Sequence, residues 1–204
     1  MEIDPTVFVV DDDQDMRSSF KWLIESVGLA VEAFRSAEEF LDVYKANRPG
    51  CLLLDVRMPG MGGLRLLERL QAAGSRLPVI VITGHGEVWM AVQAMKSGAF
   101  DFLEKPATHQ QILDRVQDAL QVDRENRARA AELAAFRRLL AQLTQREREV
   151  LDRMVKGEPS KTIALDLGIS ERTVEKHREN IMHKMEARSL AHLIRMVVEH
   201  GKDV

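Results

Sequence analysis

The sequence contains little cysteine and no long hydrophobic run. Its single thiol, Cys51, cannot form an internal disulfide, which excludes a disulfide-framework protein and fits a reducing compartment. Because Cys51 stands inside an apolar run, we expect it to be a small buried residue. No run approaches the roughly 18 residues that span a bilayer, and the first residues, MEIDPTVFVVDDD, lack the basic region and cleavage site of an export signal. The chain is therefore expected in the cytoplasm, without contact with a membrane.

Net charge is also small, since the 204 residues carry a formal charge of −3. The composition, with 45% hydrophobic and 30% charged residues, is ordinary for a globular protein and excludes collagen-like and disordered chains. The charge is unevenly distributed. Residues 1–120 hold 18 acidic and 12 basic side chains, whereas residues 144–204 hold 11 acidic and 12 basic ones. This asymmetry predicts different partners for the two ends of the chain.

The first 106 residues alternate short apolar runs with amphipathic stretches. The apolar runs are Val7–Val10, Leu29–Phe34, Cys51–Leu54, Val79–Ile82 and Phe100–Leu103. Four of the five are typical of strands buried on both faces. The expected helices are Asp15–Val27, Ala37–Ala46, Gly63–Ala73 and Glu87–Ser97. The second of these begins with a capping box at Ser36 and Glu39. The alternation predicts an α/β, doubly wound fold with a five-stranded parallel sheet covered on both faces.

Glycine and proline are absent from Ala107 to Lys156. An apolar stripe at Ile112, Val116 and Leu120 predicts the last helix of a first domain that covers residues 1–120. Residues 121–143 are charged and strongly helix-forming, and we interpret them as a helical linker. Six apolar residues follow a heptad spacing here: Ala119, Val122, Leu133, Phe136, Leu140 and Leu143. Because Asn126 and Arg129 interrupt this seam, pairing with a second copy and a solvated spacer helix both remain open.

A second domain is expected over residues 144–204, where helix signals begin again. Thr144 and Glu147 form a second capping box. The following helix is ended by Gly157 and Pro159, a shorter helix capped by Ser160 reaches Leu167, and two more follow, from Ser170 to about Met185 and over Ser189–Glu199. Two helices joined by a tight turn at Gly168 predict a helix-turn-helix within an all-α, four-helix domain.

Acidic and polar side chains stand where the predicted strands end. Asp11, Asp12 and Asp13 follow the first strand, and Asp55 follows the third. The hydroxyl of Thr83 follows the fourth strand, and the ammonium of Lys105 follows the fifth. In a parallel sheet these positions share one edge. Clustered carboxylates call for a balancing cation, and oxygen ligands favour Mg²⁺ or Mn²⁺. A hydroxyl, an ammonium and a metal around one carboxylate suit a transferred phosphoryl group.

Four motifs carry a resemblance to a known family. They are FVVDDD, LLLDVRMPGMGG, VIVITGHG and AMKSGAFDFLEKP, which together resemble the receiver domain of bacterial two-component response regulators. The stretch ITGHGEVWMAVQAMKSGAFDFLEKP, taken with the C-terminal part, resembles the FixJ subfamily, and the match covers nearly the whole chain. The resemblance implies a flavodoxin-like receiver domain over residues 1–120.

The same resemblance implies roles for the residues at the matching positions of the receiver. Asp55 is the expected phosphoryl acceptor, and the expected ligands of the Mg²⁺ ion are Asp12, Asp55 and the backbone carbonyl of Arg57. Asp11 is expected to act in the same acidic pocket. Thr83 and Lys105 are expected on the phosphoryl oxygens, with a cis peptide bond between Lys105 and Pro106.

The resemblance also implies a switch and a dimer face. Thr83 and Phe102 are the expected switch residues, and the expected dimer face contains Val92, Met95 and Lys96. Two residues depart from the subfamily, because Trp89 stands where Pro is common and Ala107 where Phe is common. Both are expected near the dimer face.

The C-terminal part, LTQREREVLDRMVKGEPSKTIALDLGISERTVEKHRENIMHKM, resembles the LuxR/FixJ-type helix-turn-helix domain. Val174, Ile181 and Met185 lie at helical spacing and are expected to anchor the recognition helix to the core. Such a helix fits the major groove of DNA, where Glu175 can accept from a cytosine amino group. The expected DNA-binding residues are Thr173, Glu175, Lys176, His177, Arg178 and Lys184.

These expectations describe a phosphorylation-activated transcriptional regulator and not an enzyme. Its expected partners are a sensor histidine kinase, double-stranded promoter DNA and, on phosphorylation, a second copy of the chain, with RNA polymerase as a further candidate. One alternative is a Mg²⁺-dependent aspartyl-phosphate phosphohydrolase, but Asp55 lacks a second acid two residues later. Another is a phosphate-independent DNA-binding protein, against which the complete acidic pocket argues.

Overall fold

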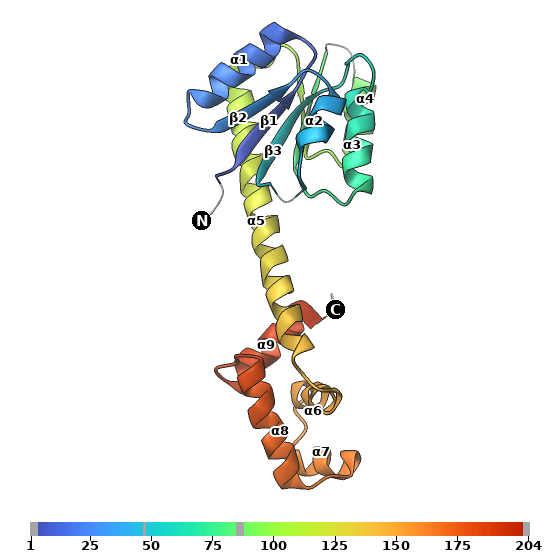
Figure 1. The fold of residues 1–204 in the computed structure, drawn as a ribbon, viewed down its shortest axis with the longest axis vertical. Coiled ribbons are helices and arrows are strands. Elements are labelled where there is room, and N and C mark those ends of the chain that lie inside the picture. The colour runs from blue at the N-terminus through green and yellow to red at the C-terminus, as the bar shows by residue number, and fades with distance from the viewer. Residues whose placement is uncertain (1–3, 47, 85–87, 202–204) are drawn as a thin grey trace. The chain divides into compact units, whose positions relative to one another are not determined.

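The structure is a computed structural model that describes residues 4–46, 48–84 and 88–201 (Figure 1). The chain divides into two compact units, Met1–Arg127 (unit 1) and Ala128–Val204 (unit 2). Each unit has its own hydrophobic core, so the two are described separately.

Unit 1 contains the five-stranded parallel sheet that the sequence predicts. Its strands are β1 (Thr6–Val10), β2 (Ala30–Phe34), β3 (Gly50–Asp55), β4 (Val79–Thr83) and β5 (Asp101–Glu104). They pair in the order β2-β1-β3-β4-β5, and every pair is parallel. This order is that of flavodoxin-like folds and confirms the expected fold class.

Burial separates the central strands from the edge strands. All residues of β1, β3 and β4 are buried, whereas β2 and β5 are each partly exposed. The prediction of four fully buried strands is therefore wrong by one. The reason is that β2 and β5 lie at the two edges of the sheet, a position that an apolar run does not reveal.

Five helices follow the strands. They are α1 (Gln14–Glu25), α2 (Ala37–Val43), α3 (Gly63–Ala72), α4 (Val88–Lys96) and α5 (His109–Ala141). The first four are close to their expected ranges, although Glu87, the expected start of the fourth, lies outside the described residues. At α2 the Ser36 hydroxyl accepts from the Glu39 N–H, but the Glu39 carboxylate accepts from the Arg35 N–H and not from the cap residue. The expected capping box is thus only half formed.

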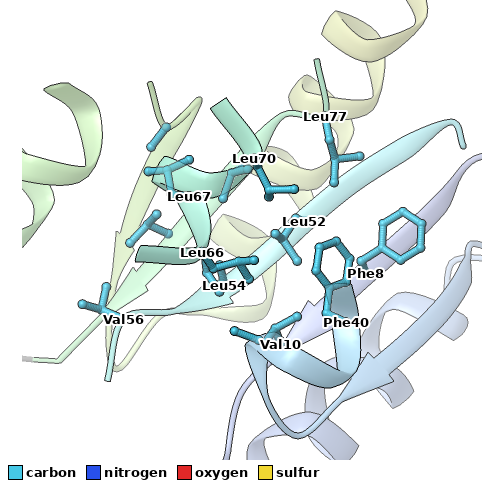
Figure 2. Packing of buried hydrophobic residues seen from close by; sticks show 14 of the residues in the cluster. Phe8, Val10, Phe40, Leu52, Leu54, Val56, Leu66, Leu67, Leu70 and Leu77 are labelled. Atoms are coloured by element: carbon cyan, nitrogen blue, oxygen red, sulfur yellow. The ribbon is translucent and has the colours of Figure 1, made fainter. Parts of the chain in front are cut away.

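The alternation of side chains along the strands divides them between two layers of helices. Phe8 and Val10 of β1 belong to a cluster with residues of α2, α3 and α4, and Figure 2 shows Phe40 of α2 over this face. Val7 and Val9 belong to the opposite cluster, which contains residues of α1 and α5. Alternation of this kind follows from the two-residue repeat of a strand. Both faces of the sheet are therefore covered by helices, as the sequence predicts.

The helix α5 continues past the sheet to Ala141 without interruption. Of the six heptad positions, Ala119 is buried against the sheet of unit 1, and Phe136 and Leu143 are buried in the core of unit 2. These three side chains are already packed within one chain, so they do not provide a seam for a second copy.

Unit 2 has the four expected helices after α5: α6 (Gln145–Val155), α7 (Ser160–Leu167), α8 (Glu171–Lys184) and α9 (Leu190–His200). The capping box of Thr144 and Glu147 is confirmed, and the Ser170 hydroxyl caps α8 as expected. Ser189, predicted as the first residue of the last helix, is instead its N-cap. Gly168 adopts the left-handed conformation, with φ 64°, and closes the turn between α7 and α8. The expected cap at Ser160 is wrong, because Pro159 takes that position and Ser160 begins the helix.

Candidate functional site

The sheet register brings the expected site residues to one edge. Val10 pairs with Leu54, so Asp11 follows β1 beside the end of β3, where Asp55 is the last residue. Asp55 pairs with Ile82, and the Lys105 N–H donates to the carbonyl of Thr83, the last residue of β4. Four strand ends thus place these side chains together, as expected for a parallel sheet.

Asp11, Asp55 and Lys105 form the centre of the site. The Lys105 Nζ lies 2.7 Å from the Asp55 Oδ1 and 3.1 Å from the Asp11 Oδ2. Both acidic residues and Thr83 are buried, whereas Lys105 is partly exposed. The Lys105–Pro106 peptide bond is cis, as the resemblance implied. One ammonium is therefore shared by two buried carboxylates.

The electrostatics of the site follow from this sharing. Burial, together with the charge of Asp11, raises the pKa of the Asp55 carboxyl above its usual range, although Lys105 and the Arg57 N–H favour its charged form. Burial disfavours the Lys105 ammonium, but hydrogen bonds and attraction to Asp55 and Asp11 outweigh that cost and raise its pKa. Burial thus disfavours the charged form of Asp55, and Lys105 favours it.

The three acids that follow β1 have separate local roles. Asp11 is buried, and its Oδ1 accepts from the Asp13 N–H at 2.9 Å. Asp13 is the N-cap of α1 and accepts from the N–H groups of Asp15 and Met16. Asp12 is exposed at this edge. The sequence placed the triplet correctly, but it did not identify Asp13 as a helix cap.

Within the described ranges, no group of three or more His, Cys, Asp or Glu side chains is arranged to hold a metal ion. The expected ligand set needs fewer, because it combines two carboxylates with the Arg57 carbonyl. These are all oxygen donors at the edge of the sheet, which is the donor type that Mg²⁺ prefers. The donor chemistry therefore fits the expected ion.

The expected dimer residues and one of the two expected switch residues, Phe102, lie around one hollow. Val92, Met95 and Lys96 of α4 line a cavity of about 380 Å³ together with Ala91 and with Phe102 of β5. Val92, Met95 and Phe102 are large apolar side chains that remain exposed, as does Trp89, which is 63% exposed. The structure thus brings the predicted dimer face and the predicted switch aromatic into a single apolar surface.

Ala107 lies elsewhere, and its expected place near the dimer face is wrong. It is half-buried against the cluster beneath α1 and α5. It lines a cavity of about 430 Å³, whose other lining residues include Met16 and Phe20 of α1 and Ile112 of α5. Residues of α4 belong to the other cluster, so Ala107 lies on the side of the sheet opposite α4.

The helix α8 is anchored as the sequence predicts. Val174, Ile181 and Met185 are fully buried in the core of unit 2. Their spacing leaves the opposite face of α8 to solvent, where Thr173, Glu175 and Lys176 are exposed. His177 and Arg178 are half-buried, and the His177 Nδ1 is buried without a hydrogen-bond partner in the part of the chain that the structure describes.

Two of the expected DNA-binding residues, Glu175 and Lys184, bond to other helices of unit 2. The Glu175 carboxylate accepts from the Ser160 hydroxyl at the start of α7. The Lys184 Nζ donates to Glu147 at 2.7 Å, and Glu147 is buried. Lys176 instead pairs with Glu179 on the exposed surface, at 3.1 Å. Sequence reasoning found the capping role of Glu147 but missed Lys184 as its partner, because 37 residues separate them.

Two family models match the chain. A response regulator receiver domain matches residues 7–117, and the luxR family of bacterial regulatory proteins matches residues 141–197. The chain therefore belongs to the response regulators with a LuxR-type DNA-binding domain, which are transcription regulators of two-component systems.

The similarity to the FixJ subfamily is confirmed by individual relatives. The transcriptional regulatory protein FixJ of Azorhizobium caulinodans is 48% identical over 195 residues, which cover 96% of this chain and 92% of that protein. FixJ of Rhizobium meliloti is 45% identical over 198 residues, 97% of each chain.

Solved structures give the same result. The response regulator StyR is 44% identical and matches with a TM-score of 0.90 over 97% of this chain and 100% of that one. Full-length FixJ from B. japonicum is 39% identical, with a TM-score of 0.61 over 97% and 98% of the two chains. None of the helices in the described residues combines the length and hydropathy of a membrane span.

Proposed function

We propose that a sensor histidine kinase transfers a phosphoryl group to Asp55, and that the phosphorylated chain dimerises and binds promoter DNA. The contact of the Lys105 ammonium with both Asp55 and Asp11 is the observation that carries the proposal. The ammonium is within reach of oxygens attached to Asp55, and the second carboxylate leaves a negative charge that favours a divalent cation.

Mg²⁺ is the proposed cofactor, and Mn²⁺ would satisfy the same ligands. Asp12, Asp55 and the carbonyl of Arg57 would hold the ion, with Asp11 next to it. When bound, the ion neutralises charge on the phosphoryl oxygens. Lys105 orients that group through its ammonium, and the buried position of Asp55 limits the access of bulk water.

The first test identifies the acceptor. A small acyl phosphate with Mg²⁺ is expected to add one acid-stable, base-labile phosphoryl group to the chain, visible by intact mass. The Asp55→Asn variant should gain none, because an amide is not a phosphoryl acceptor. Full labelling of Asp55→Asn would overturn the assignment.

The proposed switch acts through charge. A phosphoryl group adds about 1.5–2 negative charges at neutral pH. Attraction of the Thr83 hydroxyl and the Lys105 ammonium to that group would bias β4 and β5, and with them Phe102, toward one of two arrangements. Turnover of a free phosphate ester is not part of this proposal, since no acid follows Asp55 by two residues.

Dimerisation is proposed to use the surface of Val92, Met95, Lys96 and Phe102. The support is the exposure of the apolar Val92, Met95 and Phe102 around one cavity that Lys96 also lines. Light scattering with a phosphate mimic is expected to show a mass increase that Lys96→Glu weakens. A phosphorylated chain that stays monomeric at tens of micromolar would contradict the proposal.

DNA recognition is proposed for α8, through Thr173, Glu175, Lys176, His177, Arg178 and Lys184. The support is the exposed face of α8 opposite its buried anchors. Of these residues Glu175 is the candidate for base readout, because phosphates would repel it, whereas Lys176 and Arg178 attract the backbone. RNA polymerase is a further proposed partner, and the cytoplasm is the proposed location.

The proposed domain organisation follows the same division of work. Residues 1–120 would accept the phosphoryl group, residues 121–143 would act as the linker within α5, and residues 144–204 would bind DNA. The boundary between the two compact units lies between Arg127 and Ala128 in the sequence, which is inside the proposed linker.

A further inference from the structure

The loop between β3 and α3 carries Arg57, the proposed third ligand of the ion. It begins at Val56, whose N–H donates to the Ile82 carbonyl at 3.1 Å. It ends at Gly63, whose N–H donates back to the Val56 carbonyl at 3.0 Å. A Cβ at Gly63 would lie 2.1 Å from the Asp55 carbonyl oxygen, so the loop closes directly onto the backbone of the acceptor.

This loop is also held from outside by α2. The Met61 N–H donates to the Glu38 Oε1 at 3.1 Å, across 23 residues of sequence. A Cβ at Gly60, where φ is 75°, would lie 3.3 Å from the same oxygen. Glu38 therefore bonds to Met61 and leaves little room for a side chain at Gly60 on the side that faces α2.

Packing keeps α2 in position to make this contact. Phe40 of α2 is fully buried. It belongs to the same cluster as Val56 of the loop and Leu66 of α3, as Figure 2 shows. Its ring meets Phe8 of β1 edge to face, with centroids 5.7 Å apart. Phe40 therefore holds α2 against the sheet, next to loop residues Met58 and Met61, which pack in or against the same cluster.

Glu38 is well placed to keep its negative charge. It stands in the first turn of α2, where its own backbone N–H lowers the pKa of its carboxyl, and the Met61 N–H, the Ser36 hydroxyl and Arg69 act in the same direction. A charged acceptor gives a stronger hydrogen bond than a neutral one.

We propose that Glu38 is a positioning residue for phosphoryl transfer at Asp55. By holding the Met61 amide it fixes the loop in the conformation in which the Arg57 N–H reaches the Asp55 carboxylate and the Arg57 carbonyl can serve as a ligand of the ion. This inference rests on the proposed phosphorylation of Asp55. Glu38 touches neither the phosphoryl group nor the ion.

The neighbouring residue provides a matched control. The Glu39 carboxylate accepts from the Arg35 N–H at 2.9 Å, and the Glu39 N–H donates to the Ser36 hydroxyl. These contacts cap α2 and do not involve the loop. If Glu38 only stabilised α2, replacing Glu39 would have the same effect as replacing Glu38.

The experiment compares four variants of the full chain, Glu38→Ala, Glu38→Gln, Glu39→Ala and Asp55→Asn. Binding of Mn²⁺ alone is followed by electron paramagnetic resonance of the free ion, and phosphorylation by an acyl phosphate is followed by intact mass at several Mg²⁺ concentrations. Protection of the Met61 amide from hydrogen exchange reports directly on the contact.

Glu38→Ala is expected to weaken Mn²⁺ binding about tenfold, the usual effect of losing a residue that orients a ligand. Its phosphorylation should be slow at low Mg²⁺ and recover at high Mg²⁺, because the acceptor itself is intact. Glu38→Gln keeps an oxygen acceptor and should stay close to the wild type in affinity and in Met61 protection. Glu39→Ala should bind Mn²⁺ like the wild type.

The outcomes distinguish this inference from the proposed function. Suppose that the wild type binds Mn²⁺ and is phosphorylated at Asp55. If Glu38→Ala then binds Mn²⁺ as tightly as the wild type, or if Glu39→Ala loses as much Mn²⁺ affinity as Glu38→Ala, the positioning role of Glu38 is refuted and the proposed function stands. If the wild type takes up neither the ion nor the phosphoryl group, or Asp55→Asn is labelled fully, both proposals fall together.

Discussion

Glu147 is a buried carboxylate that takes part in two kinds of interaction at once. It closes the capping box of α6 by accepting from the Thr144 N–H at 2.8 Å. It also accepts from the Lys184 ammonium at 2.7 Å, which joins α6 to the end of α8. Since a buried charge is stable only when it is paired, Lys184 supports the fold of unit 2.

Lys184 and Lys176 are therefore expected to behave differently when their charge is removed. Lys184→Met should destabilise unit 2 by about 2 kcal/mol, because it leaves a buried carboxylate with fewer partners. Hydrogen exchange of peptides from residues 144–200 measures this loss. Lys176→Met should leave exchange unchanged, since its pair with Glu179 is exposed at the surface.

DNA binding at several salt concentrations completes this comparison. Lys176→Met is expected to weaken binding and to reduce the salt slope by about one unit if Lys176 contacts a phosphate. A lower salt slope of DNA binding for Lys184→Met, with normal hydrogen exchange, would show instead that Lys184 contacts DNA and does not stabilise unit 2.

The charge of Glu147 also predicts a pH dependence. Burial would raise the pKa of its carboxyl, but Lys184 and Thr144 outweigh burial and lower it below the usual value of 4.5. A carboxyl with a lowered pKa stabilises the fold above its unfolded pKa, and this contribution is lost as the pH falls through the folded pKa. Calorimetry of the full chain follows the unfolding transition of unit 2. As the pH falls from 5.5 to 3.5, the Tm of this transition should fall more for the wild type than for Glu147→Gln. Equal losses would contradict this assignment.

At the scale of elements, α5 is anchored within unit 1 by a buried acid at the end of β3 opposite Asp55. The Asp123 Oδ2 accepts from the N–H of Gly50, the first residue of β3, at 2.9 Å, and from Arg127 at 2.8 Å. Arg127 in turn donates to the Arg48 carbonyl. Gly50 approaches β1 so closely that a Cβ there would lie 1.9 Å from the backbone carbonyl oxygen of Thr6. Asp123 thus ties α5 to a tightly packed strand end.

Asp123→Ala is expected to cost about 3 kcal/mol of unfolding free energy, because it leaves the Gly50 N–H and the Arg127 guanidinium without this partner. Urea unfolding followed by tryptophan fluorescence measures it, since Trp22 and Trp89 both lie in unit 1. Asp118→Ala is the control on the same helix, because Asp118 is exposed and pairs with Arg115 at the surface. Equal effects of the two substitutions would show that Asp123 is not an anchor.

Elements with a strong local signal could be predicted from the sequence, and contacts between distant elements could not. Runs such as Val79–Ile82 mark strands because burial on both faces requires continuous apolar residues. Strand order, and therefore the exposed edges β2 and β5, depends on pairing between segments far apart in the chain. The positions of Asp55 and Lys105 at strand ends followed from the alternation, whereas the contact of Glu38 with Met61 requires α2 to lie beside the loop.

At the scale of the whole molecule, the two units have separate cores and separate reporters. The core of unit 1 is divided by the sheet into two clusters, whereas that of unit 2 is a single cluster of helical residues. Both tryptophans and the single cysteine belong to unit 1. Fluorescence and thiol chemistry therefore report on unit 1 alone.

Cys51 makes unit 1 a system whose opening can be timed. Its thiol is fully buried in β3, between β1 and β4, and burial raises its pKa, so an aromatic disulfide reagent can react only after the strands separate. Because the same strand ends at Asp55, a cation held there should oppose separation. With Mg²⁺ at 100 times its Kd, labelling is expected to slow about 100-fold when reclosing is faster than reaction. A labelling rate that does not change with Mg²⁺ would mean that β3 opens without disturbing Asp55. A labelling rate that falls as Mg²⁺ rises would make the native thiol of Cys51 a measure of cation affinity that needs no engineered cysteine.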